Sequence, residues 1–319
     1  MNGTTDERPA PRRSTRFRLT VLGCAAVPLC FAGWLGWQAL AGGTSPAAAS
    51  PSSDPSAAST APGAAEAPVP GAGPSGSPST GTSPSASAPA SGAGALAGRT
   101  VVLDPGHNSA NADHTTEINR LVDIGNARKE CDTTGTETDA GYSEAAYTLD
   151  VSHRARAILQ ARGAKVVLTQ DGDRAYGPCI DERAEIGNAA HADAVVSVHG
   201  DGAPASVSGF HVILPAKVTA GIADTSAIVE PSHRLGVTLR DTFKAATGEP
   251  YADYIGEQGL DTRSDLGGLN LSKVPKVFIE CGNMRNAGDA QRMSDPQWRQ
   301  LAAQGIADAL TAYLTDPAG

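Results

Sequence analysis

From residue 97 onward, short apolar runs alternate with longer stretches in which apolar and polar residues recur at helical spacing. The apolar runs predict strands at residues 100–103, 165–169, 194–198, 209–214 and 274–279. The longer stretches predict helices at residues 144–160, 181–190, 232–247 and 295–314. Strands that are apolar on both faces are typical of a parallel sheet covered by helices. We therefore predict an α/β fold for residues 97–319, a single domain with a mostly parallel twisted sheet and helices on both faces.

The segment before this domain has a very different pattern. Residues 1–18 contain five arginines against two acidic residues, and residues 19–41 form an uncharged apolar run. A run of this length can span a bilayer, and Ala39-Leu40-Ala41 has the small-x-small form of a signal-peptidase site. Two interpretations stay open, a cleaved signal peptide and an uncleaved membrane anchor. Both predict an extracytoplasmic domain, either secreted or held at the membrane.

Residues 42–96 consist almost entirely of Ser, Pro, Ala, Gly and Thr, and they contain no aromatic residue, lysine or arginine. Such a composition cannot bury enough apolar surface to offset the conformational entropy of the chain. It predicts a disordered tether between the apolar segment and the domain.

The folded part of the chain is acidic. The whole chain has a formal net charge of −9 although its first residues are basic, so the acidic excess lies in the domain. Proteins that bind nucleic acid gain much of their affinity from lysines and arginines that contact phosphates. We therefore expect no nucleic acid among the partners.

Three of the predicted strands end in a residue that can bind a metal or transfer a proton. The first strand runs into His107, the third into His199 and the last into Glu280. A fourth candidate, Glu144, opens a predicted helix after Ser143, which is a favourable N-cap residue. Because the carboxyl ends of parallel strands meet at one edge of a sheet, these side chains can converge there. Two imidazoles and one carboxylate suit a zinc ion with an open position, which leaves one carboxylate for proton transfer.

The motifs around these residues resemble those of the zinc-dependent N-acetylmuramoyl-L-alanine amidases, which are peptidoglycan hydrolases of the cell envelope. The matching segments are residues 101–107, the helix that opens at Glu144, and residues 193–201, 263–270 and 277–283. The resemblance implies that His107, Glu144 and His199 bind Zn²⁺ and that Glu280 is the catalytic carboxylate. It also implies hydrolysis of the amide between N-acetylmuramic acid and L-alanine, in peptidoglycan or in muropeptides, by a domain that faces the cell wall.

Two alternatives to this activity stay open. A zinc peptidase would use the same metal and carboxylate to cut within the stem peptide. A catalytically silent wall-binding or activator module would share the tether and the fold, although none of the four site residues is missing here. A cysteine hydrolase built on Cys281 is disfavoured, because alternation along a strand turns Cys281 away from Glu280.

Two further side chains are candidates for contact with the substrate. Arg263 lies in a polar stretch, where it could bind a carboxylate of the stem peptide or form a structural ion pair. His211 lies on a predicted strand and is a candidate for substrate contact or for support of another site residue. Residues 108–111 read Asn-Ser-Ala-Asn, whereas members of the family often have a glycine-rich run there, and this departure affects how a substrate would be seated.

Cys131 and Cys179 both lie in polar segments that flank the predicted site. Disulfides persist in exported proteins, so we expect these two cysteines to form one. Closing the loop between them would contribute about 4 kcal/mol by the chain-entropy relation. We expect a monomer whose partner is its peptidoglycan or muropeptide substrate, with the membrane as a second partner if residues 19–41 stay uncleaved.

Overall fold

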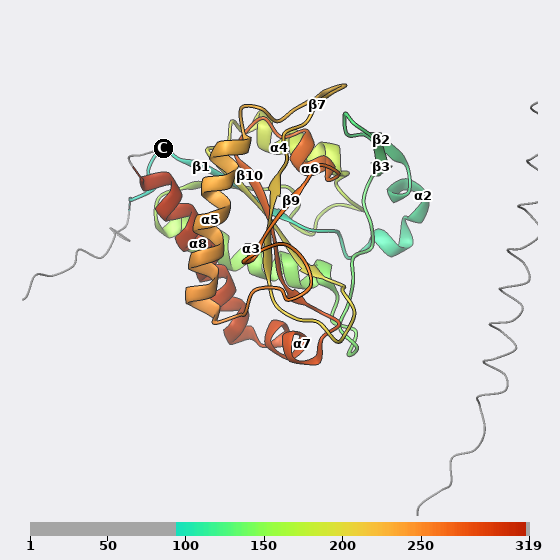
Figure 1. Cartoon of the computed structure of the whole chain (residues 1–319), viewed down its shortest axis with the longest axis vertical. Helices are drawn as coiled ribbons and strands as arrows, with labels where there is room; N and C mark the ends of the chain where they lie inside the picture. The colour runs from blue at the N-terminus through green and yellow to red at the C-terminus, as the bar shows by residue number, and fades with distance from the viewer. Residues whose placement is uncertain (1–93, 317–319) are drawn as a thin grey trace, which may run out of the picture. The chain divides into compact units, whose positions relative to one another are not determined.

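A six-stranded sheet forms the centre of the domain in the computed structural model, which describes residues 94–316 (Figure 1). Its strand order is β4-β1-β5-β10-β6-β9. The first four strands in this order run parallel to one another, β6 runs antiparallel to β10, and β9 runs parallel to β6. The strands are β1 (Thr100–Pro105), β4 (Lys165–Leu168), β5 (Ala194–Asp201), β6 (His211–Pro215), β9 (Leu260–Arg263) and β10 (Lys276–Asn283).

Helices cover both faces of this sheet, as the sequence predicts. The helices α3 (Glu144–Ala161), α5 (Val229–Thr247) and α8 (Pro296–Thr315) pack together on one face. The helix α4 (Ile180–Ala189) lies on the other face, where Gly187 approaches Val195 so closely that an added Cβ would lie 3.2 Å from its Cγ2. The short helix α6 (Gly267–Asn270) packs against α4, and α7 (Ala287–Ser294) follows β10.

The alternation of side chains along β1 shows why the strands had to be apolar on both faces. Val101 and Leu103 belong to the large core beneath α3, α5 and α8, whereas Val102 belongs to a smaller cluster on the side of α4. All three side chains are fully buried. Each strand at the centre of the sheet therefore contributes to two hydrophobic layers, which only a continuous apolar run can do.

The structure contains elements that the apolar pattern did not predict. The strand β9 has the sequence Leu-Asp-Thr-Arg and pairs only with β6, so it forms an edge strand that needs few apolar side chains. The helix α7 is short and largely polar. The remaining elements are η1 (Asn111–Asp113), α2 (Thr115–Ile118), β2 (Leu121–Asp123), β3 (Arg128–Glu130), β7 (Thr219–Ala220) and β8 (Ala223–Asp224).

A disulfide between Cys131 and Cys179 links the segment after β3 to the start of α4, as expected from the sequence. Both sulfurs belong to a small buried cluster with Val122 and Ile124. The loop between β1 and α3 is thus joined to the helix that lies beneath it.

The described part of the chain begins at Gly94, and Leu96 is already fully buried in the large core. The basic segment 1–18, the apolar run 19–41 and nearly all of the predicted tether 42–96 lie outside the described residues. Within residues 94–316, no helix combines the length and apolar character needed to cross a membrane.

Candidate metal and catalytic site

Three of the predicted site residues meet at the carboxyl edge of the parallel strands. His107 follows β1, Glu144 is the first residue of α3, and His199 lies near the end of β5. Their ligand atoms all lie within 4.8 Å of one another. Glu144 Oε1 is 3.1 Å from His107 Nε2 and 3.0 Å from His199 Nδ1, so one carboxylate oxygen faces both imidazoles.

The backbone holds the carboxylate of Glu144 in this position. Its Oε2 accepts a hydrogen bond from the amide of Thr136 at 3.0 Å, and its Oε1 accepts one from the amide of Gly200 at 3.1 Å. Glu144 is only 4% exposed. Burial by itself would raise the pKa of this carboxyl group, but His107 and His199 outweigh that effect and lower the pKa. The group is therefore ionised and available to a cation.

His107 presents its Nε2 to the site because its other ring nitrogen is engaged. Its Nδ1 donates to the carbonyl oxygen of Thr133 at 3.1 Å, and Asp132 Oδ1 lies 3.5 Å from the same nitrogen. A carbonyl can only accept, so Nδ1 carries a hydrogen and Nε2 is the nitrogen left for a metal. Burial lowers the pKa of His107, but Glu144 and Asp132 outweigh that effect and raise it to about 10, so without a bound cation Nε2 carries a second proton that a metal ion would displace.

Two aromatic contacts and one glycine set the orientation of His199. Its ring stacks on Phe278 with the centroids 5.1 Å apart and an interplanar angle of 13°. It meets the ring of His107 edge-on, at 5.1 Å and 89°. Gly106 passes so close that an added Cβ would lie 2.3 Å from Cε1 of His199. Only glycine therefore lets β1 and the ring occupy this arrangement.

Glu280 faces the same cavity from the middle of the sheet. The cavity measures about 340 Å³ and is lined by both histidines, Glu144, Glu280 and Arg263. Glu280 pairs in register with His199 on β5 and with His211 on β6. Its Oε2 is buried and has no hydrogen-bond partner among the described residues. Burial, together with the negative charges of Glu144 and Asp201, raises the pKa of Glu280 well above its ordinary value.

The donor set fits a divalent metal ion. Two imidazole nitrogens and one carboxylate oxygen are the ligands of many sites that keep an open position for water or substrate. Glu280, whose Oε2 has no hydrogen-bond partner among the described residues, lines the same cavity, so a polar ligand bound there could satisfy this group. The arrangement can therefore hold a cation beside a carboxyl group that is able to exchange a proton.

Arg263 lines this cavity, and it also forms an ion pair. Its Nε and Nη2 donate to Asp265 Oδ1 and Oδ2, both at 2.7 Å. The structural ion pair expected for Arg263 is therefore present and leaves the residue at the cavity. Contact with a carboxylate of the stem peptide stays a prediction.

His211 lies opposite Glu280 on the neighbouring strand β6, but it does not line the cavity. Its side chain is 2% exposed, it is absent from the cavity lining, and it meets the ring of Tyr254 edge-on at 6.1 Å. Burial lowers the pKa of His211 and favours the neutral ring. This position favours support of the β6–β10 pair over direct contact with a substrate, and both roles stay predictions.

Cys281 points away from the cavity into the large core. Burial raises the pKa of its thiol, so the thiolate that a cysteine nucleophile requires is disfavoured. The position of the side chain agrees with the strand alternation expected from the sequence.

Sequence reasoning missed several residues that shape the site, including Asp132, Thr133 and Arg183. These three residues line a second cavity of about 250 Å³. It adjoins the first cavity and shares His107, His199 and Phe278 with it. The sequence offered one signal that Arg183 has buried partners, because it places this arginine on the face of its helix that packs against the sheet. Its partners come from distant segments that no local pattern identifies.

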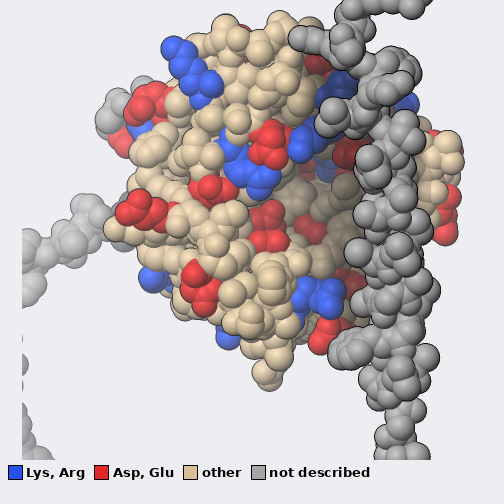
Figure 2. Space-filling model, turned by 45° about the vertical axis from the view of Figure 1, so that its right-hand side comes forward, with Lys and Arg blue, Asp and Glu red and all other residues tan. Residues whose placement is uncertain are grey.

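The surface of the domain carries charges of both signs. On the visible part of the face in Figure 2, acidic and basic side chains are interspersed. The expected absence of nucleic acid among the partners stays a prediction.

Comparison with known proteins gives the family of the chain. The Amidase_3 family model, described as N-acetylmuramoyl-L-alanine amidase, matches residues 101–312. The N-acetylmuramoyl-L-alanine amidase Rv3717 of Mycobacterium tuberculosis is 40% identical over 220 residues, which cover 69% of this chain and 88% of that protein.

Two crystal structures of the amidase Ami1 have a similar fold. The structure from Mycobacterium smegmatis has a TM-score of 0.64 and 41% identity, covering 69% of this chain and 98% of that one. The structure from Mycobacterium abscessus has a TM-score of 0.63 and 44% identity, covering 69% of this chain and 100% of that one. These findings show that the chain is an enzyme that belongs to the N-acetylmuramoyl-L-alanine amidase family.

Proposed function

We propose that this amidase depends on zinc and hydrolyses the amide between N-acetylmuramic acid and L-alanine, in peptidoglycan or in muropeptides. One observation carries the proposal. The ligand atoms of His107, Glu144 and His199 lie within 4.8 Å of one another, beside the unpartnered carboxyl oxygen of Glu280.

His107 Nε2, His199 Nδ1 and a carboxylate oxygen of Glu144 would hold the ion. When bound, zinc would polarise the carbonyl of the scissile amide and lower the pKa of water from 15.7 towards about 7. The hydrogen bond from His107 Nδ1 to Thr133 keeps the ring in the tautomer that a ligand needs. The backbone amides of Thr136 and Gly200 keep the carboxylate of Glu144 in place.

Glu280 would accept the proton of the attacking water and deliver it to the departing amine. A carboxyl group suits this task when its pKa is raised towards the working pH, because it can then both accept and release a proton. Burial of Glu280 and its acidic neighbours act in that direction. The adjoining position of Arg263 in the cavity lining supports contact with a carboxylate of the stem peptide.

We further propose that the enzyme acts outside the cytoplasm on the cell wall. The basic residues 1–18, the apolar run 19–41 and the tether 42–96 support export, by a cleaved signal peptide or as an anchored protein. A monomer with one substrate-binding cavity would then reach the wall through its tether.

The experiment is to incubate the purified chain with muropeptides and to identify the products by mass spectrometry. We expect release of an intact stem peptide with a free N-terminal alanine, loss of this product with a chelator, and its return on addition of zinc. A cut within the peptide would instead support the peptidase alternative. Zinc binding without any cleavage would support the silent module.

A further inference from the structure

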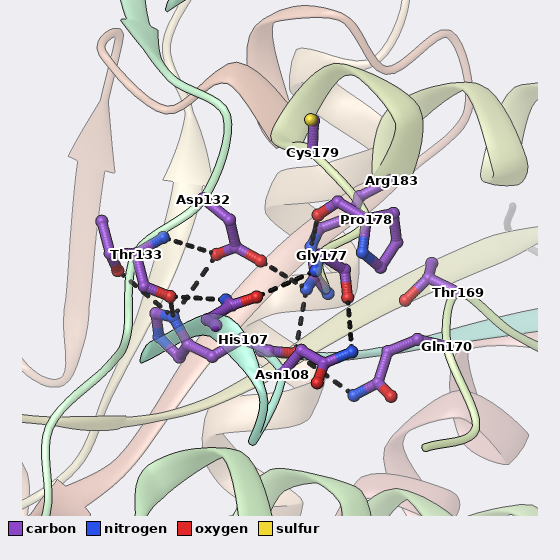
Figure 3. Close-up of polar contacts among 12 residues, drawn as sticks. His107, Asn108, Asp132, Thr133, Thr169, Gln170, Gly177, Pro178, Cys179 and Arg183 are labelled. Carbon is purple, nitrogen blue, oxygen red and sulfur yellow. Dashed lines mark hydrogen bonds and ion pairs between the residues drawn. The ribbon is translucent and has the colours of Figure 1, made fainter. Parts of the chain in front are cut away.

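Arg183 forms the centre of a buried network next to His107, one of the proposed metal ligands (Figure 3). It lies on α4 and is 5% exposed. Its Nη2 donates to the carbonyl oxygen of His107 and to Asp132 Oδ2, both at 3.0 Å. Its Nη1 donates to Asp104 Oδ1 at 2.9 Å and to the carbonyl oxygen of Pro105 at 2.6 Å. One side chain thus contacts three residues of the segment 104–107 and the loop segment opposite it.

The backbone of His107 needs such support. Its φ is +61°, in the left-handed region that residues other than glycine seldom adopt. Its carbonyl oxygen accepts hydrogen bonds from both Arg183 Nη2 and Gln170 Nε2, the latter at 3.2 Å. Two donors from different segments therefore determine where this peptide group points, and with it the start of the His107 side chain.

Arg183 also supports the groups that face the ring of His107. The carboxylate of Asp132 accepts from Arg183 through Oδ2, while its Oδ1 lies 3.5 Å from His107 Nδ1. The next residue, Thr133, supplies the carbonyl oxygen that accepts from Nδ1. The guanidinium group therefore holds both the backbone of His107 and the segment that selects its tautomer.

We propose that Arg183 is a positioning residue that aims Nε2 of His107 at the metal. This inference rests on the metal site proposed above and assigns Arg183 no contact with the substrate or the ion. It acts through His107 alone, by fixing the backbone and the ring partners of that ligand.

A lysine could not replace this function. Guanidinium offers five N–H groups in a rigid plane, whereas an ammonium group is a compact charge that cannot reach several acceptors on different segments at once. Arg183 is also not the only positive charge beside Asp104, because Lys276 Nζ lies 2.9 Å from Asp104 Oδ2. Arg183→Lys therefore keeps the charge of the network and removes its geometry.

Arg162 offers a matched control. It is 8% exposed, and it donates to the carbonyl oxygen of Ala307 at 3.0 Å, to Thr311 Oγ1 at 2.7 Å and to Asp308 Oδ1 at 2.6 Å. It is a buried arginine with both backbone and side-chain acceptors, but it lines neither cavity of the site. Arg162→Lys therefore reports what a purely structural role would cost.

The experiment measures the zinc affinity of the full chain by competition with a chromophoric chelator, and the thermal midpoint of the metal-free protein. We expect Arg183→Lys to weaken zinc binding by about 10- to 100-fold, the range found when the partner of a metal-binding histidine is lost. We expect Arg162→Lys to lower the thermal midpoint and to leave the zinc affinity within twofold of the unchanged protein.

Equal zinc affinities of Arg183→Lys and Arg162→Lys would overturn the inference, because Arg183 would then be only structural. If Arg183→Lys does not fold, Asp132→Asn decides the question. A loss of zinc affinity in this second variant supports the network, and an unchanged affinity rejects it. Failure of the unchanged protein to bind zinc would instead reject the proposed metal site, so the two outcomes can be told apart.

Discussion

The two carboxylates of the site differ in what surrounds them. Glu144 accepts two backbone hydrogen bonds and faces two imidazoles, whereas Glu280 has a buried Oε2 without a hydrogen-bond partner among the described residues. These surroundings lower the pKa of Glu144 and raise the pKa of Glu280. The difference separates a residue suited to binding a cation from one suited to exchanging a proton.

We predict that Glu280→Gln lowers kcat by roughly 10²–10⁴, because the amide cannot accept or release the proton in the reaction. Zinc affinity should stay near that of the unchanged protein, since Glu280 is not among the three proposed ligands. Muropeptide turnover and chelator competition measure the two quantities. Glu257→Gln, at an exposed position, is the control. Near-normal turnover of Glu280→Gln would remove Glu280 from the mechanism.

A second prediction concerns Gly106. The Cβ of Gly106→Ala would lie 2.3 Å from Cε1 of His199, so the ring, which stacks on Phe278, must move. We expect a loss of zinc affinity of about tenfold or more, as for other changes that misplace a ligand. Gly288→Ala in α7 is the control, because its Cβ would meet only Asn286 Oδ1, at 3.3 Å, among its close contacts. Equal affinities of the two variants would contradict the account of His199.

At the scale of elements, the long connection between β1 and α3 has little regular structure of its own. It contains the short helices η1 and α2 and the hairpin β2–β3, and it supplies Asp132 and Thr133 to the site. Its cysteine is bonded across a separation of 48 residues to the start of α4, the helix that carries Arg183. The disulfide therefore joins the two segments whose side chains meet behind His107.

We predict that replacing Cys131 and Cys179 together by serine lowers the free energy of unfolding by about 2–5 kcal/mol, because the unfolded chain gains conformational freedom. Urea denaturation followed by circular dichroism measures the change. The reduced unchanged protein should show a similar loss, and an intact mass two hydrogens higher should confirm its reduction. Superimposable denaturation curves with and without reductant would contradict the prediction.

At the scale of the whole molecule, a buried ionic network joins the central strands to α4. The carboxylate of Asp104 lies 2.9 Å from both Arg183 Nη1 and Lys276 Nζ, and it also accepts from Thr169 Oγ1 at 2.7 Å. Burial raises the pKa of Asp104, but the two cations and the hydrogen bonds outweigh it and hold the pKa well below its usual range. Asp104 therefore stays ionised in the folded protein.

This shift predicts how stability depends on pH. Because the pKa of Asp104 is lower in the folded than in the unfolded chain, its contribution is complete above the unfolded value of about 3.9 and is lost as the pH falls below it. Asp104→Asn should cost about 3–5 kcal/mol at pH 7, since it leaves buried cations without their partner. The difference from the unchanged protein should shrink by up to about 1.4 kcal/mol per pH unit below pH 4.

Urea denaturation of both proteins at pH 7, 5, 4 and 3 tests this prediction. Asp241→Asn, at an exposed carboxylate, serves as the control and should change stability little at any of these values. A difference between Asp104→Asn and the unchanged protein that stays constant down to pH 3 would contradict the role of Asp104.

The apolar runs, the residues at their ends and the predicted start of the helix at Glu144 were enough to predict the α/β class and the meeting of His107, Glu144 and His199. The reason is topological, because parallel strands bring their carboxyl ends to one edge whatever their order in the sheet. Strand β9 and helix α7 escaped prediction because an edge strand and a short surface helix need few apolar residues.

The sequence by itself thus determined the fold class and the residue types gathered at one edge, because both follow from hydrophobic periodicity and strand direction. Only the tertiary structure decided which nitrogen of each histidine faces Glu144, that one oxygen of Glu280 has no partner, and that Arg183 supports His107. These features depend on contacts between segments far apart in the chain, for which local sequence patterns contain no signal.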